Sequence, residues 1–361
     1  MIIRVKKTIT AVATFMSLML TATSCSMMQE DRSDCPDCRN TLRIMLRYDY
    51  NTARANMFAD HVKEATVYVV DPTTDTVVDT QTARNDDSNR PWSPSFAFNF
   101  EELAPGNYRL YATGRSKADA TISTVEPLTA DAISRLQFTV PVDSTGNVTA
   151  ERLDTLWNTL APVDIRVLES EPTEATIPLM RLTNDLNIVV FRRDGSLAGG
   201  HERYDVSVTD ENVTLGYDNT TTATAPLVYR PFAAWTTEST VSDGSTIGTP
   251  DGSAVAERNA HYDLSLFRLV SHDDARRNAR LIIRNRETAH EIVNIDLCHY
   301  LALARNAYET RHYGVQEYLD REYDYRLDFG IEGTGPSETW KYITISINVL
   351  SWSIRIQNEE L

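Results

Sequence analysis

The residues best suited to chemistry are the chain's four cysteines. Cys25, Cys35 and Cys38 lie close together near the N-terminus, whereas Cys298 lies in an apolar segment much later. Thiolates bind zinc, exchange disulfides or act as redox nucleophiles, and the spacing of the cysteines decides between these classes. A zinc site built on Cys35 and Cys38 needs two further ligands. Cys298 and its neighbour His299 are the only additional candidates.

Cys35 and Cys38 have the C-x-x-C spacing that redox motifs and zinc sites share. A redox pair needs its first thiol at the N-terminus of a helix, which lowers the pKa of that thiol. This pair stands between a polar segment and a strand-like run, so we interpret it as a local disulfide formed in an oxidising compartment. Free thiols remain the alternative. Cys298 is expected to be a buried packing residue.

No other pattern in the sequence points to catalysis. The serine-hydrolase, zinc-protease, P-loop and dinucleotide-binding motifs do not occur. His290 and His299 lack the spacing of a metal-binding helix, and the acidic pairs at 86–87 and 273–274 lie in polar stretches typical of solvated loops. The sequence therefore predicts that the protein is not an enzyme and uses neither a metal nor another cofactor.

The N-terminus has the three parts of an export signal. A short basic region at residues 4–7 precedes an uncharged apolar run at 9–20, which is too short for a comfortable membrane span. Small and polar residues follow, and Cys25 comes directly after Ala22-Thr23-Ser24. This arrangement resembles the lipobox of bacterial lipoproteins, although Ala22 stands where leucine is usual. The resemblance implies a signal peptide of residues 1–24 and lipidation of Cys25, with plain secretion as the alternative.

Composition defines the class of protein that follows this signal. The chain has 361 residues, of which 42% are hydrophobic and 24% charged, as expected for a folded chain long enough for two domains. Its formal net charge of -16 repels phosphate backbones, so nucleic acid is not an expected partner.

Most of the remaining chain has the short alternating runs of β-strands, separated by Pro, Gly, Asn and Asp turns. We expect a polar lipidated tether at 25–40, then a mainly β fold of two antiparallel sandwich domains in tandem, 41–182 and 183–361. Short helices are expected at 52–64, 131–136 and 297–308, and a surface loop at 236–256. The expected strands are 41–50, 65–71, 95–100, 107–114, 186–195, 204–212, 214–219, 261–270, 279–285 and 322–331.

The C-terminus has the clearest alternation. Isoleucines at 343, 345 and 347 share one face with Val349, and the apolar series then continues at 350, 352, 354 and 356. The phase slips by one residue between the two series, which would move every side chain to the opposite face of a continuous strand. We therefore expect a strand, a tight turn near 348–351 and a final strand that ends close to the C-terminus.

Several stretches, in order, resemble the FimB/Mfa-type fimbrial anchor lipoproteins of the Bacteroidales. The resemblance covers nearly the whole chain after the signal, and Cys38 is an addition to the family's DCP. The main stretches are DCP (34–36), LRIMLRYDYN (42–51), VKEATVYVVD (62–71), LAPGNYRLYATG (103–114), DTLWNT (154–159), PLMRLTNDLNIVV (178–190), YDNT (217–220), ARLIIRNRETAHEI (279–292) and QEYLDREYDY (316–325).

The resemblance implies two transthyretin-like β-sandwiches, lipid attachment to the outer membrane, exposure at the cell surface at the base of a fimbrium, and no enzymatic activity. It also implies that the partner is a stalk pilin, and fimbrial subunits assemble by adding a strand to a neighbouring sheet. We expect the final strand, with Trp352, Ile354 and Ile356, to be the strand-exchange segment, and we expect the anchor to limit fimbrial length. An ordinary core strand is the alternative for this segment; a tip adhesin or a glycan-binding surface lipoprotein is the alternative for the protein.

Overall fold

The computed structural model describes residues 41–85, 92–117, 121–169, 171–192, 199–222, 225–241, 255–349 and 352–357. Internal contacts group the chain into two compact units. The described part of the smaller unit holds residues 41–43, 99–106 and most of 166–174, where Arg43 forms an ion pair with Glu174 at 2.9 Å. The larger unit holds 44–98, 107–165 and 175–361. The division into domains at residue 182 stays a prediction.

Most of the described strands before residue 182 form an eight-stranded sheet in the order β3-β2-β5-β8-β10-β1-β4, with β9 paired to β5. Every residue of the centre of β2 is buried, so both faces of this strand are covered. The strands are β1 (Leu42–Arg47), β2 (Glu64–Asp71), β3 (Thr76–Arg84), β4 (Phe98–Phe100), β5 (Gly106–Arg115), β8 (Leu156–Thr159), β9 (Val163–Val167) and β10 (Thr173–Arg181).

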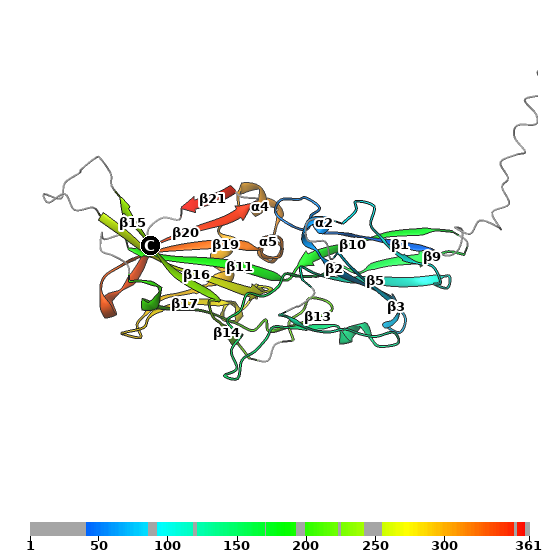
Figure 1. Cartoon of the computed structure of the whole chain (residues 1–361), viewed down its shortest axis with the longest axis horizontal. Helices are drawn as coiled ribbons and strands as arrows, with labels where there is room; N and C mark the ends of the chain where they lie inside the picture. The colour runs from blue at the N-terminus through cyan, green and yellow to red at the C-terminus, as the bar shows by residue number, and fades with distance from the viewer. Residues whose placement is uncertain are drawn as a thin grey trace, which may run out of the picture. The chain divides into compact units, whose positions relative to one another are not determined.

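The later strands form a six-stranded and a four-stranded sheet (Figure 1). The six-stranded order is β15-β16-β11-β19-β20-β21, and β11 with β19 is a parallel pair among antiparallel ones. These strands are β11 (Thr183–Arg192), β15 (Ala233–Val241), β16 (Val255–Phe267), β19 (Asp324–Glu332), β20 (Thr339–Val349) and β21 (Trp352–Gln357). The four-stranded order is β14-β12-β17-β18. Its strands are β12 (Tyr204–Asp210), β14 (Leu227–Tyr229), β17 (Arg280–Asn285) and β18 (Glu291–Asp296).

A small three-stranded sheet joins distant parts of the sequence. Its order is β13-β7-β6, and β13 (Thr214–Gly216) pairs with β7 (Gln137–Thr139), which pairs with β6 (Ser123–Val125). A strand from beyond residue 182 therefore completes a sheet that begins well before it.

The helices are short and lie mainly in the later part of the chain. They are α2 (Phe58–His61), α3 (Leu297–Ala302), α4 (Ala307–His312) and α5 (Val315–Arg321), with 3-10 turns η2 (Ile133–Arg135), η3 (His201–Arg203), η4 (Ala275–Arg277) and η5 (Gly335–Ser337). Within the described ranges, none of the helices has the length and apolarity needed to span a membrane.

One apolar cluster in the larger unit draws on all four sheets. It includes Tyr68 of β2, Phe138 of β7, Val208 of β12 and Phe329 of β19, each at most 1% exposed. Apolar area removed from water is the main stabilising contribution to folding. The sheets before and after residue 182 therefore depend on a common core.

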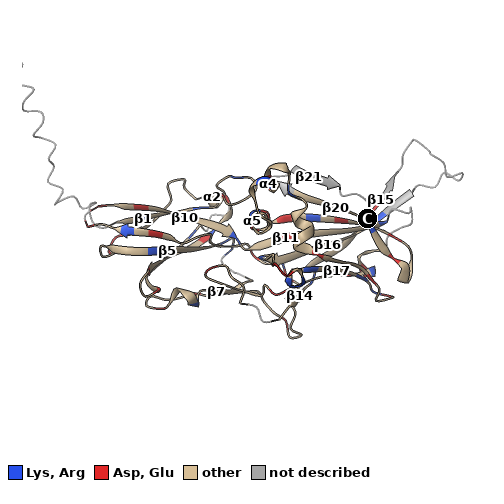
Figure 2. Ribbon diagram, turned by 180° about the vertical axis from the view of Figure 1, so that it is seen from behind, with Lys and Arg blue, Asp and Glu red and all other residues tan. Residues whose placement is uncertain are grey.

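Charged residues are interspersed along the described strands (Figure 2). Several pair with the neighbouring strand: Arg84 of β3 contacts Glu64 of β2, and Arg284 of β17 lies 3.0 Å from Glu291 of β18. Such exposed pairs contribute little to stability individually.

The expected mainly β class is confirmed, and most expected strands are present within a few residues. Three expectations were wrong in detail. The helix at 52–64 is reduced to α2, and the helix at 297–308 is two helices, α3 and α4. The expected loop at 236–256 begins in β15 and ends in β16, and only 242–254 lies outside the described residues.

Candidate functional site

Three of the four cysteines lie outside the described residues. The signal at 1–24, the lipidation site Cys25 and the pair Cys35 and Cys38 precede residue 41, where the description begins. Their roles stay predictions. The site that the structure does describe is the C-terminal hairpin.

The final strand is present where the alternation predicted it. β20 ends at Val349 and β21 begins at Trp352, so the chain reverses where the apolar phase slips. The two strands pair antiparallel from Val349 to Thr344. Their register pairs Val349 with Trp352, Ile347 with Ile354, and Ile345 with Ile356.

The strand that carries β21 is firmly held. Ile343, Ile345 and Ile347 of β20 are at most 3% exposed and belong to the common core. On its other side β20 pairs with β19 over nearly its whole length. Among the strands that the structure describes, β21 pairs with β20 alone, and it forms the edge of the six-stranded sheet. An edge strand presents a row of backbone N–H and C=O groups that can pair with another chain.

A buried ion-pair network fixes the start of β20. Glu338 is fully buried, and its carboxylate accepts hydrogen bonds from Arg192 at 3.2 Å, Arg203 at 2.7 Å and the amide of Asn285. The His290 ring nitrogen Nε2 lies 2.8 Å from the Glu338 carbonyl oxygen. These residues come from β11, η3, β17 and the turn after β17. The network therefore ties both sheets of this part of the molecule to the residue that directly precedes β20.

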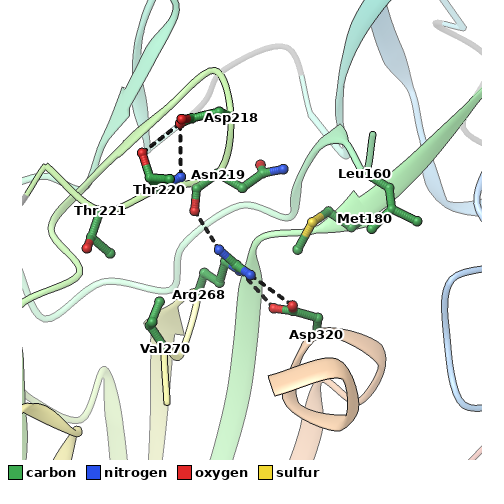
Figure 3. A pocket seen from close by; sticks show the side chains of 9 residues that line it. All are labelled: Leu160, Met180, Asp218, Asn219, Thr220, Thr221, Arg268, Val270 and Asp320. Carbon is green, nitrogen blue, oxygen red and sulfur yellow. Dashed lines mark hydrogen bonds and ion pairs between the residues drawn. The ribbon is translucent and has the colours of Figure 1, made fainter. Parts of the chain in front are cut away.

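A pocket of about 430 Å³ lies in the larger unit, and none of its lining residues belongs to the hairpin (Figure 3). Arg268 donates to both carboxylate oxygens of Asp320, at 2.7 and 2.8 Å, and to the carbonyl of Asn219. Asp218 accepts from the backbone N–H and hydroxyl of Thr220. The pocket is lined by Leu160, Met180, Asp218, Asn219, Thr220, Thr221, Arg268, Val270 and Asp320.

Four of the stretches behind the family resemblance meet at this pocket. Asn158 of DTLWNT donates to the side-chain oxygen of Asn219 of YDNT at 2.8 Å, and Asn219 donates to the Thr159 carbonyl at 2.8 Å. Met180 and Asp320 come from two further stretches. The polar groups mostly satisfy one another, so we interpret these stretches as the connection between early and late strands rather than as a reactive centre.

The remaining chemical candidates have structural surroundings. Cys298 is fully buried in α3, and burial raises the pKa of its thiol far above the usual range, which keeps it protonated and unreactive. Within the described ranges, no cluster of three or more His, Cys, Asp or Glu side chains is arranged to hold a metal ion. Sequence reasoning missed the Glu338 network and the Arg268–Asp320 pair, because residues so far apart in sequence leave no local signal.

Comparisons with known proteins point in one direction. The model of the family described as fimbrillin-A associated anchor proteins Mfa1 and Mfa2 matches residues 32–358. No curated protein sequence matches the chain.

Solved structures share the fold. A candidate adhesin from Bacteroides thetaiotaomicron is 24% identical, with 88% of this chain and 97% of that chain covered and a TM-score of 0.67. A candidate polysaccharide-binding protein from the same species is 22% identical, with 89% and 99% covered and a TM-score of 0.67. The fimbrial anchor protein Mfa2 of Porphyromonas gingivalis is 15% identical, with 87% and 98% covered and a TM-score of 0.60.

Proposed function

Because this chain belongs to the family of fimbrillin-A associated anchor proteins Mfa1 and Mfa2, we propose that it anchors a cell-surface fimbrium by binding the first stalk subunit. Family membership indicates an association with fimbriae and their stalk subunits at the cell surface. We propose in addition that the protein is attached to the membrane, binds by strand addition and controls fimbrial length. No catalytic step is needed, since backbone hydrogen bonds and side-chain pockets hold such assemblies together.

Attachment is proposed to run through Cys25. Each methylene of an acyl chain contributes roughly 0.8 kcal/mol on burial, so more than one chain holds a folded protein on the outer membrane. Cells expressing Cys25→Ala should lose incorporation of labelled palmitate and release the protein into the medium. Unchanged palmitate labelling would mean that the lipid is attached to another residue, and the assignment to Cys25 would be wrong.

The segment proposed to engage the stalk subunit is β21. The observation that carries this proposal is its place: among the described strands it is a sheet edge, and it pairs with β20 alone. An edge strand can pair where it lies, or it can leave its sheet and insert into a neighbouring subunit.

Truncation tests whether β21 is used at all. A chain that ends at Val349 should remain folded and lipidated, because Ile343 to Ile347 keep their core contacts, but its cells should shed fimbriae. The matched control ends at Gln357 and keeps β21 complete. Fimbriae that stay attached to cells with the shorter chain would show the proposal to be wrong, and a chain that unfolds would favour an ordinary core role for β21.

An engineered, reducible disulfide between β20 and β21 tests whether β21 leaves its sheet to insert into the stalk subunit or pairs with that subunit while it stays in its sheet. Ser346 and Arg355 lie directly opposite each other in the β20–β21 register, and opposite residues stand about 4.5–5.5 Å apart, a separation that a disulfide can bridge. If β21 must leave its sheet, the oxidised Ser346→Cys/Arg355→Cys variant should fail to retain fimbriae until a reductant is added. If the stalk subunit pairs with β21 in place, the disulfide should have no effect.

The adhesin class makes a different prediction about position. Immunogold labelling should mark the cell-proximal base of each fimbrium for an anchor and the distal end for a tip subunit. If the anchor also limits growth, cells without it should carry fewer attached fimbriae and longer released ones.

A further inference from the structure

An exposed tryptophan lies on β15, which forms the edge of the six-stranded sheet opposite β21. Trp235 keeps 38% of its surface exposed, a large value for a side chain of this size and hydrophobicity. The neighbouring Thr236 points to the other side of the strand, where its hydroxyl accepts from the backbone N–H of His201 in η3. Because successive side chains alternate across a strand, η3 covers the inner face and Trp235 stands on the outer face.

A stacked partner holds the Trp235 ring in place. Its indole lies parallel to the ring of His261 on β16, with centroids 5.1 Å apart and planes within 4°. The hydroxyl of Thr237 lies 2.8 Å from Nε2 of His261 and fixes that ring in turn. One side of the indole is therefore occupied, and its exposed surface belongs to the opposite side and the rim.

The same outer face carries a second pair of rings. Phe191 of β11 and Tyr342 of β20 are half-buried and meet edge to face with centroids 6.2 Å apart. Gly330 of β19 stands between them in the register and adds no side chain to the row. From standard strand and residue spacings, Trp235 and Phe191 are about 12 Å apart in the plane of the sheet. The aromatic surface therefore extends beyond the size of a single sugar ring.

Charged side chains on this face already have polar or charged partners. Asn187 donates to Asp263 at 2.6 Å, and Arg326 donates to Asp328 at 2.7 Å. Their remaining donor and acceptor positions can bind hydroxyl groups, whereas a strongly charged ligand would have to disrupt these pairs. The face therefore fits a ligand that is neutral, rich in hydroxyl groups and extended.

We propose that the outer face of the six-stranded sheet binds a neutral oligosaccharide, with one sugar ring packed on the exposed side of Trp235 and further sugars extending toward Phe191 and Tyr342. The C–H groups of a pyranose face are weakly positive and pack against the negative face of an aromatic ring. Ordered rings such as the Trp235–His261 stack lose little conformational entropy on binding. The site is separate from β21, so the protein can hold a fimbrium and a glycan at the same time.

The test uses the full chain in a polyoxyethylene detergent, which carries no sugar. Native gels are cast with galactomannan, xyloglucan, arabinan, mannan or a soluble β-glucan, and with heparin as the charged comparison. At least one neutral polysaccharide should retard the protein. Trp235→Ala should weaken that binding about tenfold or more, and Trp235→Tyr should retain most of it because a ring face remains.

A matched control comes from another exposed ring. Tyr308 of α4 is 45% exposed, so Tyr308→Ala removes a similar aromatic surface elsewhere and should leave the retardation unchanged. The proposal fails if no neutral polysaccharide retards the protein, if heparin alone does so, or if Trp235→Ala behaves as the unmodified chain. The anchor function is scored separately: cells with Trp235→Ala should keep their fimbriae, and a chain lacking β21 should still bind the polysaccharide.

Discussion

At the scale of single residues, two buried carboxyl groups stand out. Glu322 is 2% exposed, and its side chain accepts hydrogen bonds from the Thr52 hydroxyl at 2.8 Å and from the N–H of Tyr323 at 2.9 Å. Asp210 is 3% exposed, and the N–H of Glu211 donates to its carboxylate. Burial raises the pKa of each group to about 7. Removal from water disfavours the charged form, and few partners compensate for it.

These shifts predict how stability depends on pH. Both pKa values are higher in the folded chain than in the unfolded chain, so the folded state binds protons more tightly between about pH 4 and 7. Their contribution to stability is fully present below pH 4 and is lost as the pH rises through 7. Glu322→Gln imitates the protonated form. The free energy of unfolding of this variant should exceed that of the unmodified chain by about 2 kcal/mol at pH 8, and the two should be equal near pH 4.

The measurement is urea unfolding at each pH, with Glu102→Gln as the control because Glu102 is exposed. The control should follow the unmodified chain throughout. A Glu322→Gln curve that runs parallel to the unmodified curve from pH 4 to 8 would show that Glu322 titrates in the same range whether folded or unfolded.

At the scale of elements, the turn that contains Asn219 connects the early and late strands. Asn219 adopts a left-handed backbone conformation with φ of 64° and is 6% exposed. Its side chain bonds both Asn158 and the Thr159 carbonyl at the end of β8. Asparagine tolerates this backbone better than most residues with a Cβ, so one residue meets the conformational and the hydrogen-bonding demand.

Asn219→Ala should destabilise the chain by about 2–4 kcal/mol, because it leaves buried polar groups without partners and strains the backbone. Asn219→Gly separates the two effects: it relieves the backbone but also lacks the side chain. We expect glycine to recover only part of the loss in chemical unfolding. Full recovery would mean that the hydrogen bonds to β8 contribute nothing.

Elements differ in how far the sequence predicts them. β20 and β21 follow from strict alternation and one phase slip, which are local signals of the kind that strands require. The break between α3 and α4 also had a local signal that was overlooked: Asn306 and Glu309 form a capping box that starts a new helix. β15 had none, because its Thr- and Ser-rich sequence resembles a loop and becomes a strand by pairing with β16.

The candidate sites divide in the same way. β21, which we propose as the strand-exchange segment, was predicted as a strand from its own sequence, and the structure shows its backbone pairing with β20. The exposure of Trp235 could not be predicted from the sequence, because it depends on η3 covering only one side of β15. The pairing of Arg268 with Asp320 depends on the assembled fold, and neither residue carries a mark of it in the sequence.

At the scale of the whole molecule, the common core predicts cooperative unfolding. Tyr68, Val208 and Phe329 come from three different sheets and belong to one buried cluster. Loss of either group of strands would expose the apolar surface of the other, which costs roughly 25 cal/mol for each Å². Calorimetry of the full chain should therefore show a single transition whose calorimetric and van't Hoff enthalpies agree. Two separated transitions would instead indicate independent domains.

The positions of the first and last strands determine how the molecule responds to mechanical load. β1 lies inside its sheet between β10 and β4, whereas β21 lies at an edge. Ladder hydrogen bonds run across the strands, so a pull along β1 strains all of its bonds at once. A force that lifts one end of β21 away from β20 breaks the hydrogen bonds between the two strands one after another. β1 should therefore resist a force along its length, whereas β21 should separate from its sheet at a smaller force.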